Sequence, residues 1–304
     1  MHILYVAVFD DQGKSNDISA ARAMADLMPG NGREGLIPYP HRIRLALLGK
    51  EERDNEIIEY CQVYTPDLVF FVKCDNMDTR VFEECKKICP IAFWFADPLV
   101  TFRGDSSYLE KAKVSNFVFV DKKNVQEEIL PHNPQTFIVA DGFDKHVDVP
   151  HDVPQDLEVT FIGNPYGDRS DKLRQLDRSI GLISNAFGSS HAIAVSRSKI
   201  NLNFCTSDGP SNRVYKVLAA GGFLLSDDWL DREKEFEDGK HLVVFKDMED
   251  ARKKIAYYLE HEEERQRIAE EGHRVSHKYT RHEWARKVLG ICLNKKGTKN
   301  DTPK

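Results

Sequence analysis

The first half of the chain alternates short apolar runs with amphipathic segments. Residues 67–73 (DLVFFVK) and 90–95 (PIAFWF) have apolar cores on both strand faces. Such strands are typical of a parallel sheet that helices cover on both sides. The pattern predicts strands at 2–9, 67–73, 90–95 and 116–121, and helices at 20–28, 51–64, 79–88 and 108–113.

A second αβ series follows residues 141–155, a segment rich in Asp, His and Pro that we interpret as a linker. Strands are predicted at 157–162, 181–183, 200–204, 223–226 and 241–245. Helices are predicted at 169–178, 192–198, 212–220, 249–260, 262–279 and 283–293. We therefore expect an α/β chain with two doubly wound, Rossmann-like domains, at 1–150 and 151–294, and a disordered tail at 295–304. Ligands in such sheets bind beyond the carboxyl ends of the strands.

Composition narrows the class of protein. The 304 residues contain 43 Lys and Arg against 49 Asp and Glu, a net charge of −6, which excludes a broadly basic nucleic-acid coat. No apolar run approaches the roughly 20 residues that cross a bilayer, so no membrane span is expected. The 6 cysteines form no CxxC pair. We expect a reducing, cytoplasmic location and see no sign of an obligate protein partner.

The most informative segment is 208–222, DGPSNRVYKVLAAGG, which follows the strand at 200–204. Ser211 or Asn212 suits the N-cap of a helix that the two glycines end. Free backbone N–H groups and Arg213 at the positive pole suit a phosphate or pyrophosphate, and Lys216 lies one turn further on. An ordinary capped helix with a surface arginine explains the segment equally well on local sequence alone.

A second segment, VTFIGNPYGDR at 159–169, places a strand before Gly163 and a tight turn beginning at Asn164. Gly163 permits close backbone approach to a ligand, and Arg169 opens the next helix. A plain turn with a solvated arginine is the simpler interpretation of this segment by itself.

Together, FIGNPYGDR, NRVYKVLAAGGFLLSD and the charged stretch after residue 235 resemble the C-terminal domain of the CgeB-like, spore-maturation-type glycosyltransferases. The resemblance runs from about residue 157 to 290 and implies GT-B architecture, with a last helix crossing back onto the first domain. It implies that Gly163 and Asn164 lie near the donor diphosphate and that Ser211, Asn212 and Arg213 bind the phosphates. A UDP-sugar is the expected donor, bound as a substrate, with no separate cofactor.

The resemblance has one departure. Related families often place a glutamate, which holds ribose or sugar hydroxyls, where this chain has Lys216, and some carry another eight residues earlier, at Asp208. A lysine cannot accept hydrogen bonds from hydroxyls. Either Lys216 binds phosphate, or donor recognition is unusual, or activity is lost.

The N-terminal domain supplies the acceptor-side candidates. Asp97 follows a buried strand and is placed to act as a general base for an acceptor hydroxyl, or to form a turn before proline. Lys73 ends a strand at the rim of the expected cleft. The loop after the first strand offers small polar residues, although Asp17 or Ser19 there can simply cap a helix. The remaining cleft candidates are Gly13, Ser15, Asn16, Tyr39, His41 and Arg42.

No Asp-x-Asp triplet occurs, so we expect no metal at the donor diphosphate. The charge of the diphosphate would then be neutralised by Arg213, Lys216, Arg169 and the positive amino end of the helix at 212–220. No G-x-G-x-x-G follows a strand, which argues against a dinucleotide-dependent dehydrogenase.

The leading hypothesis is therefore a metal-independent glycosyltransferase that moves a sugar, hexose or pentose, to a hydroxyl acceptor. A viral or phage-type enzyme acting on hydroxymethylpyrimidines in DNA is a second version, which would use Arg33, Arg42, Arg44 and Arg103. A non-catalytic nucleotide- or glycan-binding relative is the alternative from a different class.

Overall fold

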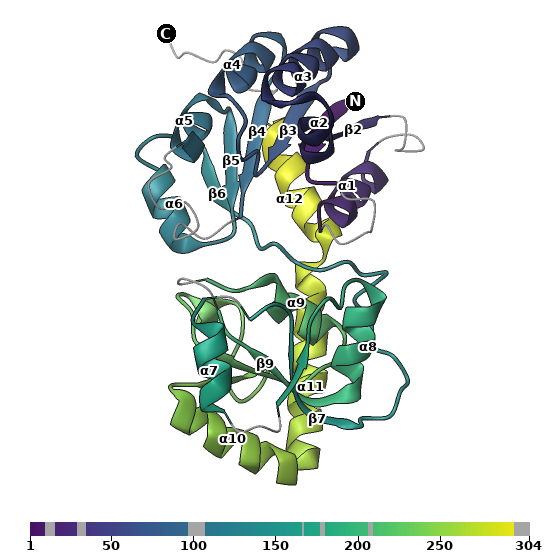
Figure 1. Ribbon diagram of the computed structural model, residues 1–304, viewed down its shortest axis with the longest axis vertical. Coiled ribbons are helices and arrows are strands. Elements are labelled where there is room, and N and C mark those ends of the chain that lie inside the picture. Colours follow the sequence, from purple (N-terminus) through teal and green to yellow (C-terminus); the bar gives the residue numbers. More distant parts are fainter. Residues whose placement is uncertain are drawn as a thin grey trace, which may run out of the picture. The chain divides into compact units, whose positions relative to one another are not determined.

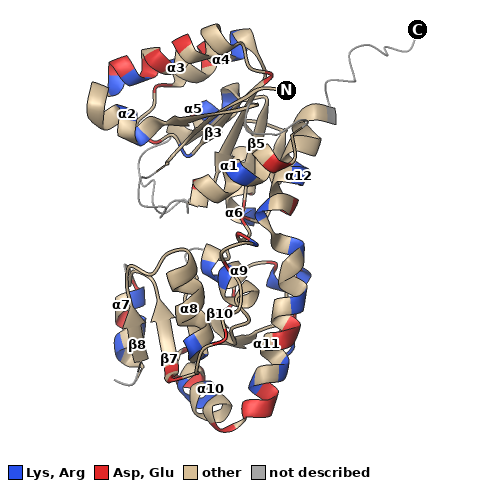
Figure 2. Cartoon of the chain, turned by 90° about the vertical axis from the view of Figure 1, so that its right-hand side faces the viewer, with Lys and Arg blue, Asp and Glu red and all other residues tan. Residues whose placement is uncertain are grey.

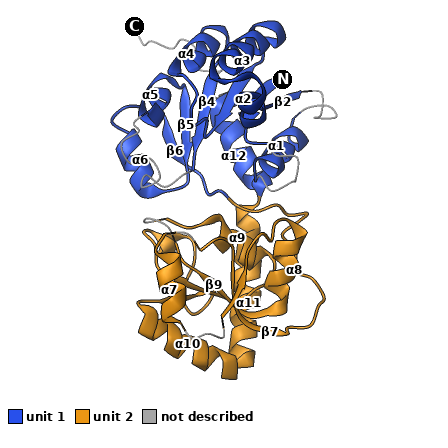
Figure 3. Cartoon of the chain, in the orientation of Figure 1, with its two compact units in different colours: residues 1–141, 281–304 blue, residues 142–280 orange. Residues whose placement is uncertain are grey.

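The computed structural model describes residues 1–9, 16–28, 35–96, 107–165, 167–176, 180–205 and 209–294. The chain forms two compact units: unit 1 contains residues 1–141 and the stretch from residue 281 onward, and unit 2 contains residues 142–280 (Figure 3). None of the helices in the described ranges is long and apolar enough to cross a membrane.

Within the described residues, unit 1 is built on a 6-stranded parallel sheet (Figure 1). In sheet order its strands are β2 (Leu36–Pro40), β1 (Ile3–Ala7), β3 (Leu68–Val72), β4 (Ile91–Phe95), β5 (Phe117–Val120) and β6 (Thr136–Ile138). Its helices are α1 (Asn16–Asp26), α2 (His41–Leu48), α3 (Lys50–Tyr64), α4 (Thr79–Ile88), α5 (Ser107–Val114), α6 (Lys123–Ile129) and α12 (Arg281–Asn294).

Helices cover both faces of this sheet. Successive strand residues point to opposite sides, and the side chains on both sides are apolar and buried. In β1, Leu4 and Val6 pack into one apolar cluster with α3 and α4. Tyr5 packs into the other cluster with α1 and α12, where the ring of Trp284 stands edge-on to Phe70, 5.8 Å between centroids. The charged residues lie mainly on helices and loops, whereas the strands are nearly free of them (Figure 2).

Unit 2 has a 5-stranded parallel sheet in its described part. In sheet order its strands are β11 (Val243–Phe245), β10 (Leu224–Asp227), β9 (Ser198–Asn203), β7 (Leu157–Ile162) and β8 (Ile180–Ile183). Its helices are α7 (Arg169–Gln175), α8 (Ser189–Arg197), α9 (Asn212–Ala219), α10 (Met248–Glu260) and α11 (Glu262–Ser276), with short 3-10 turns η2 (Arg232–Lys234) and η3 (His277–Tyr279).

The two sheets share one topology. Counted along the chain within each unit, the strand order begins 2-1-3-4-5 in both. The direction of winding reverses between the first and third strands, which are β1 and β3 in unit 1 and β7 and β9 in unit 2. The carboxyl ends of these strand pairs are the places where doubly wound sheets bind ligands. The prediction of two Rossmann-like domains is confirmed.

The division of the chain differs from the sequence-based one. Unit 1 ends at Asp141 rather than at residue 150, and α12 belongs to unit 1 rather than to the C-terminal domain. Asp141 and Arg281, the residues at which the chain leaves and re-enters unit 1, form an ion pair whose arginine side chain is 4% exposed. The expectation that the last helix packs with the first domain is confirmed by its contacts with α1.

Candidate functional site

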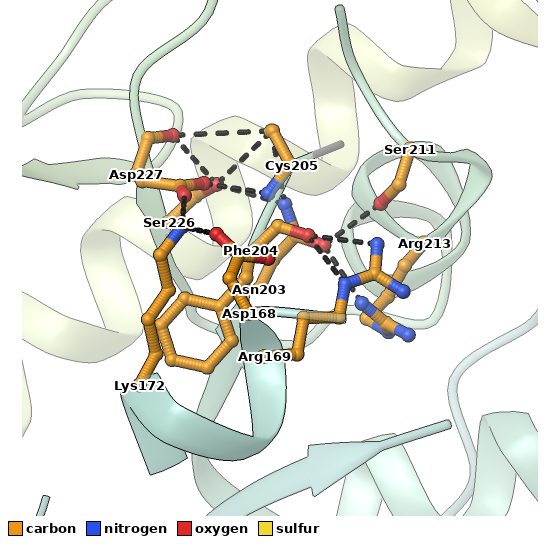
Figure 4. Close-up of polar contacts among 10 residues, drawn as sticks. All are labelled: Asp168, Arg169, Lys172, Asn203, Phe204, Cys205, Ser211, Arg213, Ser226 and Asp227. Carbon is orange, nitrogen blue, oxygen red and sulfur yellow. Dashed lines mark hydrogen bonds and ion pairs between the residues drawn. The ribbon is translucent and has the colours of Figure 1, made fainter. Parts of the chain in front are cut away.

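Arg213 joins the two strands at the switch point of unit 2. Its Nε donates to the carbonyl of Ile162, at the end of β7, over 2.6 Å. Its Nη1 donates to Oδ1 of Asn203, at the end of β9, over 2.9 Å (Figure 4). The guanidinium also lies over the Phe161 ring, 4.4 Å from its centroid. The first turn of α9 thus places a fixed cation beyond the carboxyl edge of the sheet.

Asn203 is the centre of this arrangement and is fully buried. Its Oδ1 also accepts a hydrogen bond from Ser211 Oγ at 2.7 Å, and its Nδ2 donates to Ser226 Oγ on β10 at 2.9 Å. Ser211 occupies the N-cap position of α9, but its hydroxyl makes no capping bond. The prediction of Ser211 as the N-cap residue is confirmed, but its hydroxyl binds Asn203 in place of a helix N–H group.

Gly163 lies directly beneath the Arg213 guanidinium. A Cβ atom at this position would collide with Arg213 Nη2, and the backbone φ of +136° is one that other residues rarely adopt. The neighbour that requires a glycine here is the Arg213 side chain, and the close approach of a ligand to Gly163 stays a prediction. Asn164, next along the chain, is exposed.

A second set of polar contacts lies at the end of β10, around Asp227. Asp227 Oδ1 accepts from the backbone N–H of Cys205 at 2.6 Å, and its Oδ2 lies 3.3 Å from Lys172 Nζ of α7. Burial raises the pKa of Asp227 and raises that of the Cys205 thiol to about 12. Cys205 is therefore protonated at neutral pH and unsuited to act as a nucleophile.

Arg169 opens α7 as predicted, but the residue is only 3% exposed. Its Nε and Nη2 both donate to the carbonyl of Phe204, at 3.1 and 2.9 Å. This geometry fixes the end of β9 against α7. A role for Arg169 on a donor phosphate stays a prediction.

Asn212 is the first residue of α9, and Lys216 lies one turn further along the helix and is partly exposed. The pKa of the buried His191 on α8 is lowered to about 3, mainly by burial and also by the positive charges of Lys216 and Arg213. Positive charge and the amino end of a helix thus coincide at this edge of the sheet.

Unit 1 places charged groups at its own switch point. The Asp17 carboxylate accepts from the N–H of Val8, just beyond β1, at 2.9 Å. Lys73, just beyond β3, has a positive φ of 61° and donates its N–H to Trp94. Burial raises the pKa of Asp17 to about 6, against the opposing effect of the Lys73 charge. Asn16 begins α1 beside this group.

Two acceptor-side expectations are corrected. Tyr39 is 1% exposed and its hydroxyl bonds Glu56 at 2.5 Å, while His41 is fully buried on the inner side of α2. Neither side chain is presented to an acceptor, because α2 begins directly after β2 and turns His41 into the core. Arg42 is exposed and pairs with Asp75 at 2.9 Å. Burial lowers the pKa of His41 to about 4.

Several sequence-based candidates lie outside the described residues: Gly13, Ser15, Asp97, Asp208 and, for a DNA acceptor, Arg33 and Arg103. Sequence analysis missed Asn203, Asp227 and Lys172, and considered Asp17 only as a helix cap. One signal was available for Asn203, because the strand INLNF carries two asparagines in an otherwise apolar run. A buried amide requires partners, so two of them in one strand indicate a polar network.

Among the described residues, no group of three or more His, Cys, Asp or Glu side chains could hold a metal ion.

Residues 150–290 match the model of the glycosyl transferase-like family Glyco_trans_1_2. No curated protein matches the chain by sequence. Among solved structures, HepE of Anabaena in complex with UDP-glucose aligns with a TM-score of 0.68 at 10% identity, covering 95% of this chain and 99% of that one. Sucrose-phosphate synthase of Thermosynechococcus elongatus aligns with a TM-score of 0.68 at 10% identity, covering 98% of this chain and 99% of that one. A glycosyltransferase of Rickettsia africae aligns with a TM-score of 0.65 at 11% identity, covering 98% of this chain and 99% of that one.

The structural neighbours share the two-domain GT-B fold, and most of the family match falls on unit 2, which carries the Arg213 site. The GT-B architecture predicted from the sequence is confirmed, and residues 150–290 are similar to a glycosyl transferase-like family.

Proposed function

We propose that unit 2 binds the diphosphate of a nucleotide-sugar donor beside Gly163, Ser211 and Arg213. The observation that carries this proposal is the convergence of three groups at the β7–β9 switch point: a glycine, the amino end of α9 and the Arg213 guanidinium. Backbone N–H groups at a helix start and a fixed cation stabilise an anion there. As the glycosidic bond breaks, the leaving diphosphate gains negative charge, which the same groups stabilise.

The donor we propose is a UDP-sugar. HepE of Anabaena has been solved with UDP-glucose, and its fold is similar to that of this chain over 95% of its length. The sugar passes to a hydroxyl acceptor, and the CgeB-like subfamily is the proposed relationship within the glycosyltransferases. Asp97 remains the proposed general base. The absence of an Asp-x-Asp triplet in the sequence supports transfer without a metal ion.

The described residues give no observation in favour of a DNA acceptor. Arg42 pairs with Asp75, and Arg44 pairs with Glu56, so each of these cations is already matched by a carboxylate. Binding to DNA phosphates would have to compete with those pairs.

Calorimetric titration with UDP and UDP-glucose tests the donor site. Arg213→Gln should weaken UDP binding by about tenfold or more, because a charge-assisted hydrogen bond to phosphate is lost. Arg174→Gln is the matched control, since Arg174 lies on the exposed side of α7, where it pairs with Asp171. Equal UDP affinity in the Arg213 variant and the wild type would refute the assignment.

Donor hydrolysis separates an enzyme from a binder. Wild-type protein incubated with UDP-glucose should release glucose and UDP slowly without an acceptor, since water can replace the acceptor hydroxyl. UDP binding without turnover across a panel of UDP-sugars and hydroxyl acceptors would favour the non-catalytic alternative.

A further inference from the structure

A separate cavity of about 290 Å³ lies in unit 2 at the amino ends of β9 and β10, away from the donor site at their carboxyl ends. Its walls come from the segment before β7, the start of β9, the turn after α9 and one side of α11. Its polar lining is formed by Gln155, Lys199, Arg265, Gln266, Glu270 and His273. All of these residues lie in the described part of the chain.

Two cations in this lining lack a carboxylate partner among the described residues. Lys199 is partly exposed, and its side chain forms no hydrogen bond or ion pair with the described residues. Arg265 is only 3% exposed, and the bond made by its side chain runs from Nη1 to the carbonyl of Tyr258, at 2.6 Å. Burial lowers the pKa of Arg265, an effect that the charge of Glu262 only partly opposes.

The charges in the lining favour an anion. Glu270 is the one carboxylate among the lining residues, against Lys199 and Arg265. The carboxyl end of α9 adds partial negative charge near Gly221, worth about half an elementary charge, and His273 Nδ1 lies 3.2 Å from the Leu218 carbonyl at that end. Burying a cation without a partner costs free energy, which a bound anion would offset.

We propose that this cavity is a second ligand site, which binds a small phosphate-bearing anion through Lys199 and Arg265. Its volume is at the lower limit of about 300 Å³ typical of small-molecule pockets, so it suits inorganic phosphate or the monoester of a small metabolite. Two cations from different elements can contact one phosphate together, and their charge exceeds that of Glu270 and the carboxyl end of α9. The site is independent of the proposed donor site, because it shares no residue with it.

The test is a calorimetric titration of the full chain at constant ionic strength, with inorganic phosphate and, separately, with glucose 1-phosphate. Lys199→Gln should weaken phosphate binding by about tenfold or more and leave UDP binding unchanged. Lys253→Gln is the matched control, because Lys253 lies on the exposed side of α10 beside Glu249 and should bind phosphate as the wild type does. Tighter binding of glucose 1-phosphate than of phosphate would identify an ester as the ligand, and equal binding would identify free phosphate.

Arg213→Gln distinguishes the two sites. This variant should lose UDP affinity and keep phosphate affinity, the reverse of Lys199→Gln. The proposal is overturned if the wild type binds no phosphate, if Lys199→Gln binds it normally, or if Arg213→Gln abolishes it, since the phosphate would then occupy the donor site. Failure of UDP binding alone would overturn the proposed donor site and leave this cavity's assignment standing.

Discussion

The guanidinium of Arg213 occupies the space that a Cβ atom of Gly163 would need, so any side chain at that glycine would displace the arginine. The contact joins the end of β7 to the first turn of α9, across the point where the sheet reverses its winding. A single glycine therefore controls the position of the cation that we assign to the donor phosphates.

Replacement of Gly163 by alanine should weaken UDP binding by about tenfold and destabilise the fold by about 1–3 kcal/mol, since its φ is unfavourable for other residues and its Cβ displaces Arg213. Gly167→Ala is the matched control. Gly167 also has a positive φ, of +65°, but a Cβ atom added there would meet nothing within 4 Å. The Gly167→Ala variant should lose stability through backbone strain and retain UDP affinity. Calorimetry and thermal unfolding of both variants provide the comparison, and equal UDP affinities would contradict the role of the contact.

Asn203→Asp should weaken the binding of UDP much more than it affects folding. The new carboxylate would lie where Oδ1 now accepts from Arg213 and Ser211, so it would pair with the arginine and repel the diphosphate. We expect a loss of at least about tenfold in UDP affinity, measured by calorimetry. A variant that binds UDP as tightly as the wild type would show that the diphosphate lies elsewhere.

The central strands were predictable because they are buried on both faces, which leaves long apolar runs such as LVFFV in β3. The edge strands β2 and β6, which are only partly buried, were not predicted. The short helices α2 and α6 were not predicted either. In α6, Val125 and Ile129 are the buried residues, one turn apart, and this spacing gives too little periodicity to detect. The start of α1 was placed four residues late, at Ala20, because the first turn is polar.

The site was predictable only in part. The strand–glycine and helix-start motifs identified Gly163 and Arg213, because both motifs have a local sequence signature. Their mutual contact depends on strand order, which places β7 beside β9, and strand order is a long-range property. His41 shows the converse error, since a polar residue in a short helix gives no local sign of which side it faces.

The free energy of unfolding should fall as the pH rises from about 4 to about 6, through the titration of Asp17. Its pKa is about 6 in the folded chain, against an ordinary value of 3.8, so the folded state holds this proton more tightly than the unfolded state. The resulting loss is complete above pH 6 and amounts to at most about 3 kcal/mol.

Asp17→Asn should remove this contribution, because the amide oxygen can still accept from Val8 and carries no charge. Chemical unfolding at pH 4, 5, 6 and 7 would show the variant gaining stability over the wild type as the pH rises. A difference that does not change with pH would contradict the raised pKa.

The buried pair of Arg281 and Asp141 should be far more important to stability than ion pairs on the surface of α12. Arg281→Met leaves the Asp141 carboxylate, whose side chain is 15% exposed, without its partner, and Asp141 already acts to raise the pKa of Asp17 and of Asp121. Removing one member of a buried pair costs about 3–5 kcal/mol, because the remaining charge stays desolvated.

Arg286→Met is the control on the same helix, since Arg286 pairs with Glu283 and both side chains are well exposed. It should cost at most about 1 kcal/mol. Urea unfolding measures both variants, and limited proteolysis reports whether α12 detaches from unit 1 first. Because Arg281 is the residue at which the chain re-enters unit 1, its loss should increase cleavage near residue 281 before the sheet unfolds. Equal unfolding free energies for the two variants would mean that α12 is held by its apolar contacts alone, such as those of Trp284 with Phe70 and Trp94.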